Sequence, residues 1–317
     1  MIKYTFAILL LFAVCSLSAQ QDNLFTQFAY NKLSFNPGVA GENQYTTITG
    51  IYRDQWSGLA GSPQSQMLTV NFPTLFNQLG FGLSLNRSEV GIQNKTDISG
   101  MYAYRVNIAE TSTSVGLLLN VRNFVNDFTR PDLMAVDGFE LDPAIARIKY
   151  STTNFNVGIG AYHKAKNYYL GFSIPRMIKS NIDDDAYNIN ATEVRHIYAM
   201  AGVKKALSLE WEFYPQLLFK YSENAPYDLD ALALFTYRDQ FHCGLNFRTG
   251  GTQKSFIESV DLIVGFNFNK RIFGSIAYDF TTTELREFEN GSFELLIKYS
   301  FNKDTSPSEI QNPRYFK

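Results

Sequence analysis

The sequence predicts an all-β protein, a single transmembrane antiparallel β-barrel of about 14 strands with a short periplasmic N-terminal segment and a C-terminal tail. Three observations lead to this fold class. Apolar and polar residues alternate along many segments. Aromatic residues make up 15% of the chain while charged residues make up only 18%, a balance that suits a surface facing lipid. Short and long connections also alternate between the segments, as in barrels that cross a membrane.

The first 19 residues have the order of a secretory signal peptide. A basic start at Lys3 precedes an apolar run from Phe6 to Val14, and small residues lead to Ala19. No later stretch approaches the ~18 consecutive apolar residues that a membrane-spanning helix needs, so membrane crossing is assigned to strands. We therefore predict a signal peptide at 1–19, a periplasmic N-terminal segment at 20–44, a barrel at 45–302 and a periplasmic tail at 303–317.

Period-two alternation divides the barrel region into its strands. Between residues 210 and 221, odd positions carry apolar side chains such as Trp211 and Phe219, whereas even positions carry polar ones such as Glu212. Repeating this division gives segments of roughly 9 to 13 residues, the length of a tilted strand that crosses a bilayer. The predicted strands start near residues 45, 64, 78, 96, 112, 153, 167, 194, 210, 227, 240, 256, 271 and 290.

The connections between these segments indicate their orientation. Tight links at 109–111, 164–166 and 268–270 follow even-numbered strands, and the long stretches 123–152 and 176–193 follow odd-numbered ones. With both termini in the periplasm, the long connections lie outside the cell. A water-soluble β-sandwich is the alternative, but it gives no reason for this regularity.

Charged residues on the polar faces of the strands are expected to point into the barrel. A charge facing lipid near the middle of the bilayer costs about 2–4 kcal/mol. These residues either line a pore or pair across the lumen and close it. They include Arg105, Arg122, Glu212, Lys220, Arg248, Asp279, Glu294 and Lys298.

The sequence contains no catalytic or metal-binding pattern, so we expect neither an enzyme nor a cofactor. The three histidines, His163, His196 and His242, have no cysteine or carboxylate at ligand spacing. Nucleophile elbows, phosphate loops and zinc-protease motifs are missing. A net charge of −2 with both signs scattered gives no nucleic-acid footprint.

Two further features bear on binding. Cys15 leaves with the signal peptide, so Cys243 has no partner for an intrachain disulfide. Asp183, Asp184 and Asp185 form an acidic run in a long connection. That run either holds calcium or is a solvated charge run, and the latter is favoured because it lacks the spaced ligands and glycine of a calcium loop.

Five short sequence blocks occur in order along the mature chain. They are Gln27 to Asn31 followed by Asn36-Pro37-Gly38-Val39-Ala40-Gly41, then Arg53-Asp54-Gln55-Trp56 with Gly61-Ser62-Pro63, Gly80-Phe81-Gly82, the last strand Phe293 to Phe301, and Pro313-Arg314-Tyr315-Phe316. Together they resemble the PorP/SprF family of outer-membrane proteins of the type IX secretion system. Gly38 stands where that family usually has alanine.

The same blocks have physical interpretations. Asn36, Pro37 and Gly38 form a turn sequence that ends the periplasmic segment before the first strand. Arg53 and Gln55 are expected to be inward or rim residues. Trp56 suits the aromatic girdle at the membrane interface, which we favour over direct recognition of a partner. The tail from Pro313 to Phe316 either plugs the lumen, docks a periplasmic ring component, or is a disordered terminus.

The resemblance implies a non-enzymatic outer-membrane protein that helps a secreted or adhesin-type partner reach and stay on the cell surface. Recognition of the C-terminal domain of that partner, and contacts with periplasmic type IX secretion or gliding components, follow from the same resemblance. Candidate apolar anchors in the external connections are Phe124, Phe128, Phe139 and Tyr187. The alternative is an outer-membrane porin or small-solute transporter, since about 14 strands enclose a lumen.

Overall fold

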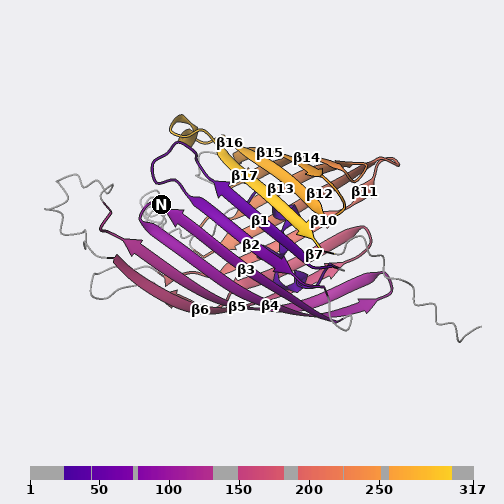
Figure 1. The fold of residues 1–317 in the computed structure, drawn as a ribbon, viewed down its shortest axis with the longest axis horizontal. Helices are drawn as coiled ribbons and strands as arrows, with labels where there is room; N and C mark the ends of the chain where they lie inside the picture. Colours follow the sequence, from indigo (N-terminus) through magenta and orange to yellow (C-terminus); the bar gives the residue numbers. More distant parts are fainter. Residues whose placement is uncertain are drawn as a thin grey trace, which may run out of the picture.

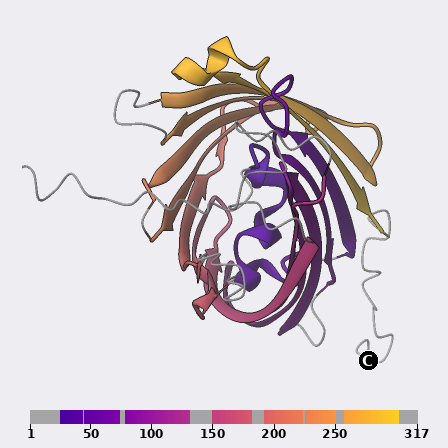
Figure 2. The same cartoon turned by 90° about the vertical axis from the view of Figure 1, so that its left-hand side faces the viewer.

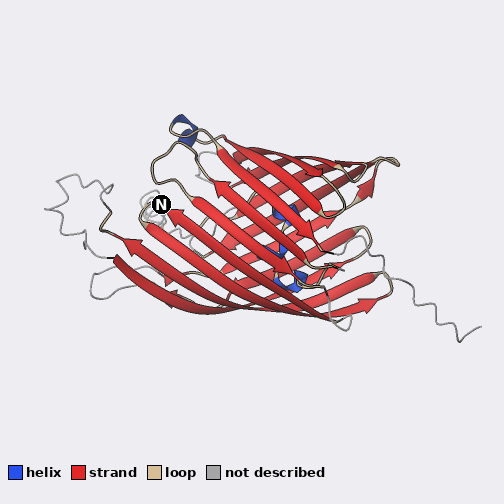
Figure 3. Cartoon of the chain, viewed as in Figure 1, coloured by secondary structure: helices blue, strands red, loops and turns tan. Residues whose placement is uncertain are grey.

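The computed structural model describes residues 25–43, 45–73, 78–130, 149–181, 192–223, 225–250 and 257–301. Within these ranges the chain forms a closed antiparallel barrel of 14 strands (Figures 1 and 3). The barrel strands are β1 (Thr47–Asp54), β2 (Gln64–Asn71), β3 (Leu79–Val90), β4 (Gln93–Ile108), β5 (Thr111–Asp127), β6 (Lys149–Lys164), β7 (Tyr168–Arg176), β10 (His196–Val203), β12 (Trp211–Ser222), β13 (Asp228–Tyr237), β14 (Phe241–Thr249), β15 (Ile257–Asn267), β16 (Ile272–Thr281) and β17 (Ser292–Ser300). Shorter elements are β8 (Ser180–Asn181), β9 (Thr192–Glu193), β11 (Lys205–Ala206) and the 3₁₀ turn η5 (Glu284–Glu287).

Neighbouring strands pair in sequence order, and the first and last strands close the ring. Thr47 to Asp54 of β1 pair with Ser300 to Phe293 of β17. The 14 predicted strands are confirmed, and each predicted start lies within four residues of the observed one. In the described ranges, no helix is long and apolar enough to cross a membrane.

The two faces of the wall differ in chemistry, as the alternation predicts. In β5, Val115, Leu117 and Leu119 are 54–67% exposed on the outside, while Ser114 and Asn120, at the alternate positions on either side of this run, are buried inside. Equivalent apolar side chains ring the outside of the other strands. Such a belt is stable only against hydrocarbon, because so large a continuous apolar surface would not be left in water.

The connections define two ends of the barrel. The 14 barrel strands are counted here as successive crossings of the membrane. The end that the chain reaches after each odd-numbered crossing, such as β1, β5 and β7, is called the outer end. The opposite end is called the inner end. Inner links such as Ala109–Glu110 are short. The expectation of long outer links is wrong after β3, where only Gly91 and Ile92 connect two strands. Instead β4, β5 and β6 are 16 to 17 residues long and carry the sheet further outward (Figure 1).

Residues 25–42 lie inside the barrel (Figures 2 and 3). Their three 3₁₀ turns are η1 (Phe28–Tyr30), η2 (Lys32–Ser34) and η3 (Pro37–Val39). Phe28, Leu33 and Phe35 are almost fully buried within the lumen. We call residues 25–42 the plug. The sequence interpretation placed this stretch in the periplasm, and for the plug that placement is wrong, because its apolar side chains and backbone groups find their partners on the inner wall.

Glycines in the wall make room for the backbone of the plug. A Cβ atom on Gly80 would lie 2.1 Å from the carbonyl oxygen of Ala40, and one on Gly116 would lie 2.4 Å from the carbonyl carbon of Pro37. Both neighbours are main-chain atoms, which cannot rotate away. Larger residues at these wall positions would therefore displace the plug.

We predict that Gly116→Val destabilises the barrel by about 1–3 kcal/mol, because it overpacks the seat of the plug. Thermal unfolding of the detergent-solubilised protein, followed by the loss of β-sheet circular dichroism, measures this change. Gly100→Val is the matched control, since a Cβ there meets nothing within 4 Å. Equal melting temperatures for the two variants would show that the plug does not occupy this seat.

Candidate functional site

The carboxylate of Glu294 holds the start of the plug near the outer end of the lumen. It accepts hydrogen bonds from the backbone N–H groups of Thr26 at 2.9 Å and Gln27 at 3.0 Å. The Thr26 hydroxyl donates to Asp279 at 2.8 Å. Glu294 and Asp279 come from adjacent strands, so the last hairpin of the barrel binds the first described residues of the plug.

Arg53 joins this hairpin to the first strand. Its guanidinium forms ion pairs with Asp279 at 2.7 Å and Glu294 at 3.1 Å, and it also donates to the Thr26 hydroxyl at 3.1 Å. The Arg53 side chain is only 2% exposed. Removing one partner of such a buried pair typically costs 3–5 kcal/mol, because the other charge is left uncompensated.

Arg248 extends the network along the wall. It lies 2.9 Å from Asp230 and 3.4 Å from Asp279, and it donates to the Thr26 hydroxyl at 3.0 Å. Lys220 continues the chain of charges through Asp230 at 2.7 Å. The sequence left two roles open for the inward charges, lining a pore or pairing across the lumen. In this network the charges pair with one another and with the plug.

Asn36 fixes the middle of the plug, and it belongs to the Asn-Pro-Gly block. Its side-chain amide donates to the carbonyl oxygens of Ala161 at 2.9 Å and Phe172 at 3.3 Å, which are paired residues of β6 and β7. Its side-chain oxygen accepts from Gly38 N at 2.8 Å and so caps η3. The predicted turn is therefore present, and it lies against the inner wall.

Gly38 also fits its position closely. A Cβ atom there would lie 3.1 Å from Cβ of Tyr162, a contact that requires a small shift of the neighbour. The Gly38 carbonyl accepts a hydrogen bond from Ser114 at 2.6 Å, and Arg105 donates to the Ala40 carbonyl at 3.0 Å. Wall side chains thus satisfy the polar backbone of this turn.

Glu42 ends the plug near the inner end. Lys164 lies 2.7 Å from its carboxylate, and the Tyr162 hydroxyl donates to it at 3.2 Å. Burial disfavours the charged form of Glu42, but the ammonium groups of Lys32 and Lys164 outweigh that effect and hold the pKa of Glu42 below its ordinary value. Glu42 therefore stays ionised at neutral pH and anchors this end of the plug.

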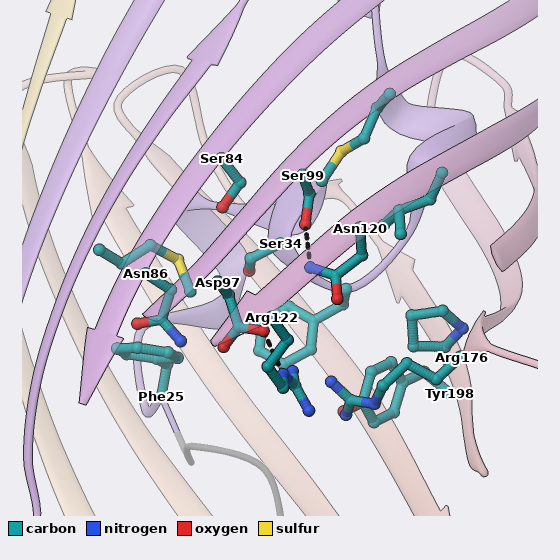
Figure 4. Close-up of a pocket in the computed structure, with 15 residues that line it drawn as sticks. Phe25, Ser34, Ser84, Asn86, Asp97, Ser99, Asn120, Arg122, Arg176 and Tyr198 are labelled. Atoms are coloured by element: carbon teal, nitrogen blue, oxygen red, sulfur yellow. Dashed lines mark hydrogen bonds and ion pairs between the residues drawn. The ribbon is translucent and has the colours of Figure 1, made fainter. Parts of the chain in front are cut away.

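A second charge network lies on the opposite wall, around Arg122. This guanidinium forms an ion pair with Asp97 (Figure 4) and another with Glu193. Arg176 lies 3.4 Å from Glu193. Glu193 belongs to β9, so a residue of the connection between β7 and β10 folds onto the inner wall. Sequence reasoning missed Glu193, because period-two alternation says nothing about a residue in a connection.

A cavity of about 80 Å³ adjoins this network, between plug and wall. Phe25 and Ser34 of the plug face Asn86 and Asn120 of the wall across it (Figure 4). The space is large enough for several water molecules, and Asn86, Asn120 and Arg122 in its lining can form hydrogen bonds with them.

Of the four predicted partner-binding residues, the structure describes Phe124 and Phe128. Phe124 lies within β5, is 3% exposed, and packs near the guanidinium of Arg122, so it is not an exposed anchor. Phe128 follows β5 and stacks on Tyr150, with ring centroids 6.1 Å apart. Phe139 and Tyr187 lie outside the described residues, as does the terminal block Pro313, Arg314, Tyr315 and Phe316.

Gln55 and Trp56 lie at the outer end, just after β1. Gln55 is buried and its N–H donates to the Pro63 carbonyl at 2.9 Å. Trp56 is half-buried with a φ of 55°, and its N–H donates to the Ser292 hydroxyl at 3.1 Å. The Arg53 block therefore joins the first strand to the last, both inside the lumen and at its rim.

Solved structures of other barrels resemble this one at low sequence identity. A Pseudomonas aeruginosa FadL homologue is 12% identical, with 87% of this chain and 94% of that chain covered and a TM-score of 0.48. The Acinetobacter baumannii outer membrane protein Omp33 is 7% identical, with 82% and 100% covered and a TM-score of 0.48. The KdgM porin is 11% identical, with 80% and 99% covered and a TM-score of 0.38.

No curated protein has a sequence significantly similar to this chain. The family model described as type IX secretion system membrane protein PorP/SprF matches residues 17–299. That match covers the plug and the barrel strands up to Tyr299 in the last one. The chain therefore belongs to the PorP/SprF family of type IX secretion system membrane proteins, and it is a β-barrel of the outer membrane.

Proposed function

We propose that this barrel is a non-enzymatic component of type IX secretion that supports export and surface anchoring of a partner protein, either secreted or adhesin-type. The observation that carries the proposal is the filled lumen. The plug runs from the Arg53 network to Glu42, and buried charge pairs occupy the wall beside it. A barrel whose interior is occupied in this way acts through its outer end and its outer surface.

The family match supports type IX secretion as the process, and the long outer connections support the outer end as the side of contact. Long connections of outer-membrane barrels lie outside the cell, so the outer end faces the surface where a secreted partner arrives. Binding of the partner through its C-terminal domain, and contacts with periplasmic secretion or gliding components, belong to the same proposal. A porin or small-solute transporter is the competing function, and it requires an open lumen.

The first test is conductance. We expect the purified wild-type barrel to show no steady ion current in planar bilayers, because the plug and its partners fill the lumen. Deleting residues 25–41 is expected to produce a steady current through an interior wide enough for ions. The gel shift on heating, which folded barrels show, confirms that the deleted form is folded. A porin-like current from the wild-type protein would overturn the proposal.

The second test is recovery of the partner. An affinity tag between β14 and β15 leaves both termini unaltered, and purification from native membranes followed by mass spectrometry identifies bound proteins. We expect a large secreted protein or type IX components to be recovered with the wild-type barrel.

Shortening the connection between β5 and β6 is expected to lower that recovery by about tenfold, equivalent to the loss of one or two good contacts. Shortening the connection between β16 and β17 by the same number of residues is the control. Recovery of the barrel alone, from native membranes of the producing cell, would contradict the anchoring role.

A further inference from the structure

Arg248 is shared by three carboxyl groups of the lumen wall. Its guanidinium lies 2.9 Å from Asp230. The carboxyl groups of Asp279 and Asp261 are further from it, at 3.4 Å and 3.7 Å. All four side chains are at most 2% exposed. One positive charge therefore serves three buried carboxyl groups on three neighbouring strands, β13, β15 and β16.

Two of these carboxyl groups have a second cation. Lys220 lies 2.7 Å from Asp230, and Arg53 lies 2.7 Å from Asp279. Buried charges are stable when each has an opposite charge or a hydrogen-bond donor at close range. Asp230 and Asp279 both meet that condition without relying on Arg248 alone.

Asp261 has weaker partners. The side-chain amide of Asn246 donates to it at 2.8 Å, but that amide carries no charge. Its contact with Arg248 is the longest ion pair of this network. A hydrogen bond from a neutral amide offsets less of the cost of burying a carboxylate than an ion pair does. Among the residues that the structure describes, Asp261 is therefore the surplus carboxyl group of the network.

Asp279 increases the cost of a charge on Asp261. The two residues lie directly opposite each other on β15 and β16, and both are buried in the lumen. Directly opposed residues have Cβ atoms about 4.5–5.5 Å apart, so two carboxylates there repel each other and favour a state in which one of them carries a proton. Asp279 contacts two guanidinium groups and the Thr26 hydroxyl, so that proton belongs on Asp261.

Arg248 also holds the start of the plug. It donates to the Thr26 hydroxyl at 3.0 Å, and that hydroxyl donates to Asp279 at 2.8 Å. A negative charge on Asp261 attracts the guanidinium away from both of these groups. A neutral Asp261 leaves Arg248 where it binds the plug.

We propose that Asp261 and Arg248 form a proton-sensitive latch on the start of the plug. Asp261 is the first carboxyl group of the network to take up a proton as the pH falls. With the proton in place, Arg248 stays with Thr26 and Asp279. When the proton leaves as the pH rises, Asp261 competes for Arg248 and the latch loosens. The latch consists of wall and plug alone, so it operates with or without a secreted partner.

Thermal unfolding of the purified barrel distinguishes a surplus carboxyl group from an ion-pair partner. A carboxyl group that binds a proton more readily in the folded chain contributes stability at low pH that is lost as the pH rises. We therefore expect Asp261→Asn to melt with wild type at about pH 5, and at the same or a higher temperature than wild type at about pH 8.

Asp230→Asn is the matched control, because it removes a close partner of both Arg248 and Lys220. We expect it to lower the melting temperature by about 6–20 °C at both pH values. If Asp261→Asn melts well below wild type at about pH 8, or does not fold, Asp261 is an ion-pair partner and the proposal is wrong.

Amide hydrogen exchange tests the latch itself. The backbone N–H groups of Thr26 and Gln27, which donate to Glu294, report on the start of the plug. At about pH 8 we expect them to exchange about tenfold faster in wild type than in Asp261→Asn, and at about pH 5 equally fast in both. Comparing two proteins at one pH removes the intrinsic pH dependence of exchange. The N–H of Gly38, bonded within the middle of the plug, is the internal control and should exchange equally in both. Equal exchange of Thr26 and Gln27 in the two proteins at about pH 8 would overturn the latch.

Discussion

The contact of the Glu294 carboxylate with Arg53 and with the backbone of Thr26 and Gln27 is the interaction on which the interior depends. A barrel wall that is apolar outside must direct its polar residues inward, where bulk water is limited. Each inward charge then needs an opposite charge or a hydrogen-bond donor. The plug supplies donors that the wall lacks, and Arg53 supplies the cation between two carboxylates.

This arrangement explains why short blocks far apart in the sequence share one structure. The Asn36 block and the Arg53 block have no local relation, yet Asn36 fixes the middle of the plug and Arg53 fixes its start. Gly80, in a third block, leaves space for the Ala40 carbonyl. These residues are best understood as parts of one packed interior that spans the height of the barrel.

The wall could be predicted from the sequence because its signal is local. Period-two alternation depends on neighbouring residues, so it located all 14 strands and the inward charges such as Arg248 and Asp279. The plug has no such period. Its density of aromatic residues, including Phe25 and Phe35, was a sign of burial, but only tertiary contacts show that the burial is inside the barrel. For the same reason Phe124 was assigned to a connection, although β5 continues past it to Asp127.

The plug also sets a condition on assembly. Thr26 contacts Glu294 across 268 positions of the sequence, so the first described residues cannot reach their partners until nearly the whole chain has been made. Contacts of such long sequence separation carry a large entropic cost before they are formed, and they form late in folding. Because β1 follows the plug directly and pairs with β17, the seam of the ring and the seat of the first plug residues are made by the same last strand. Closing the ring and fixing the start of the plug therefore both wait for the final hairpin of the chain.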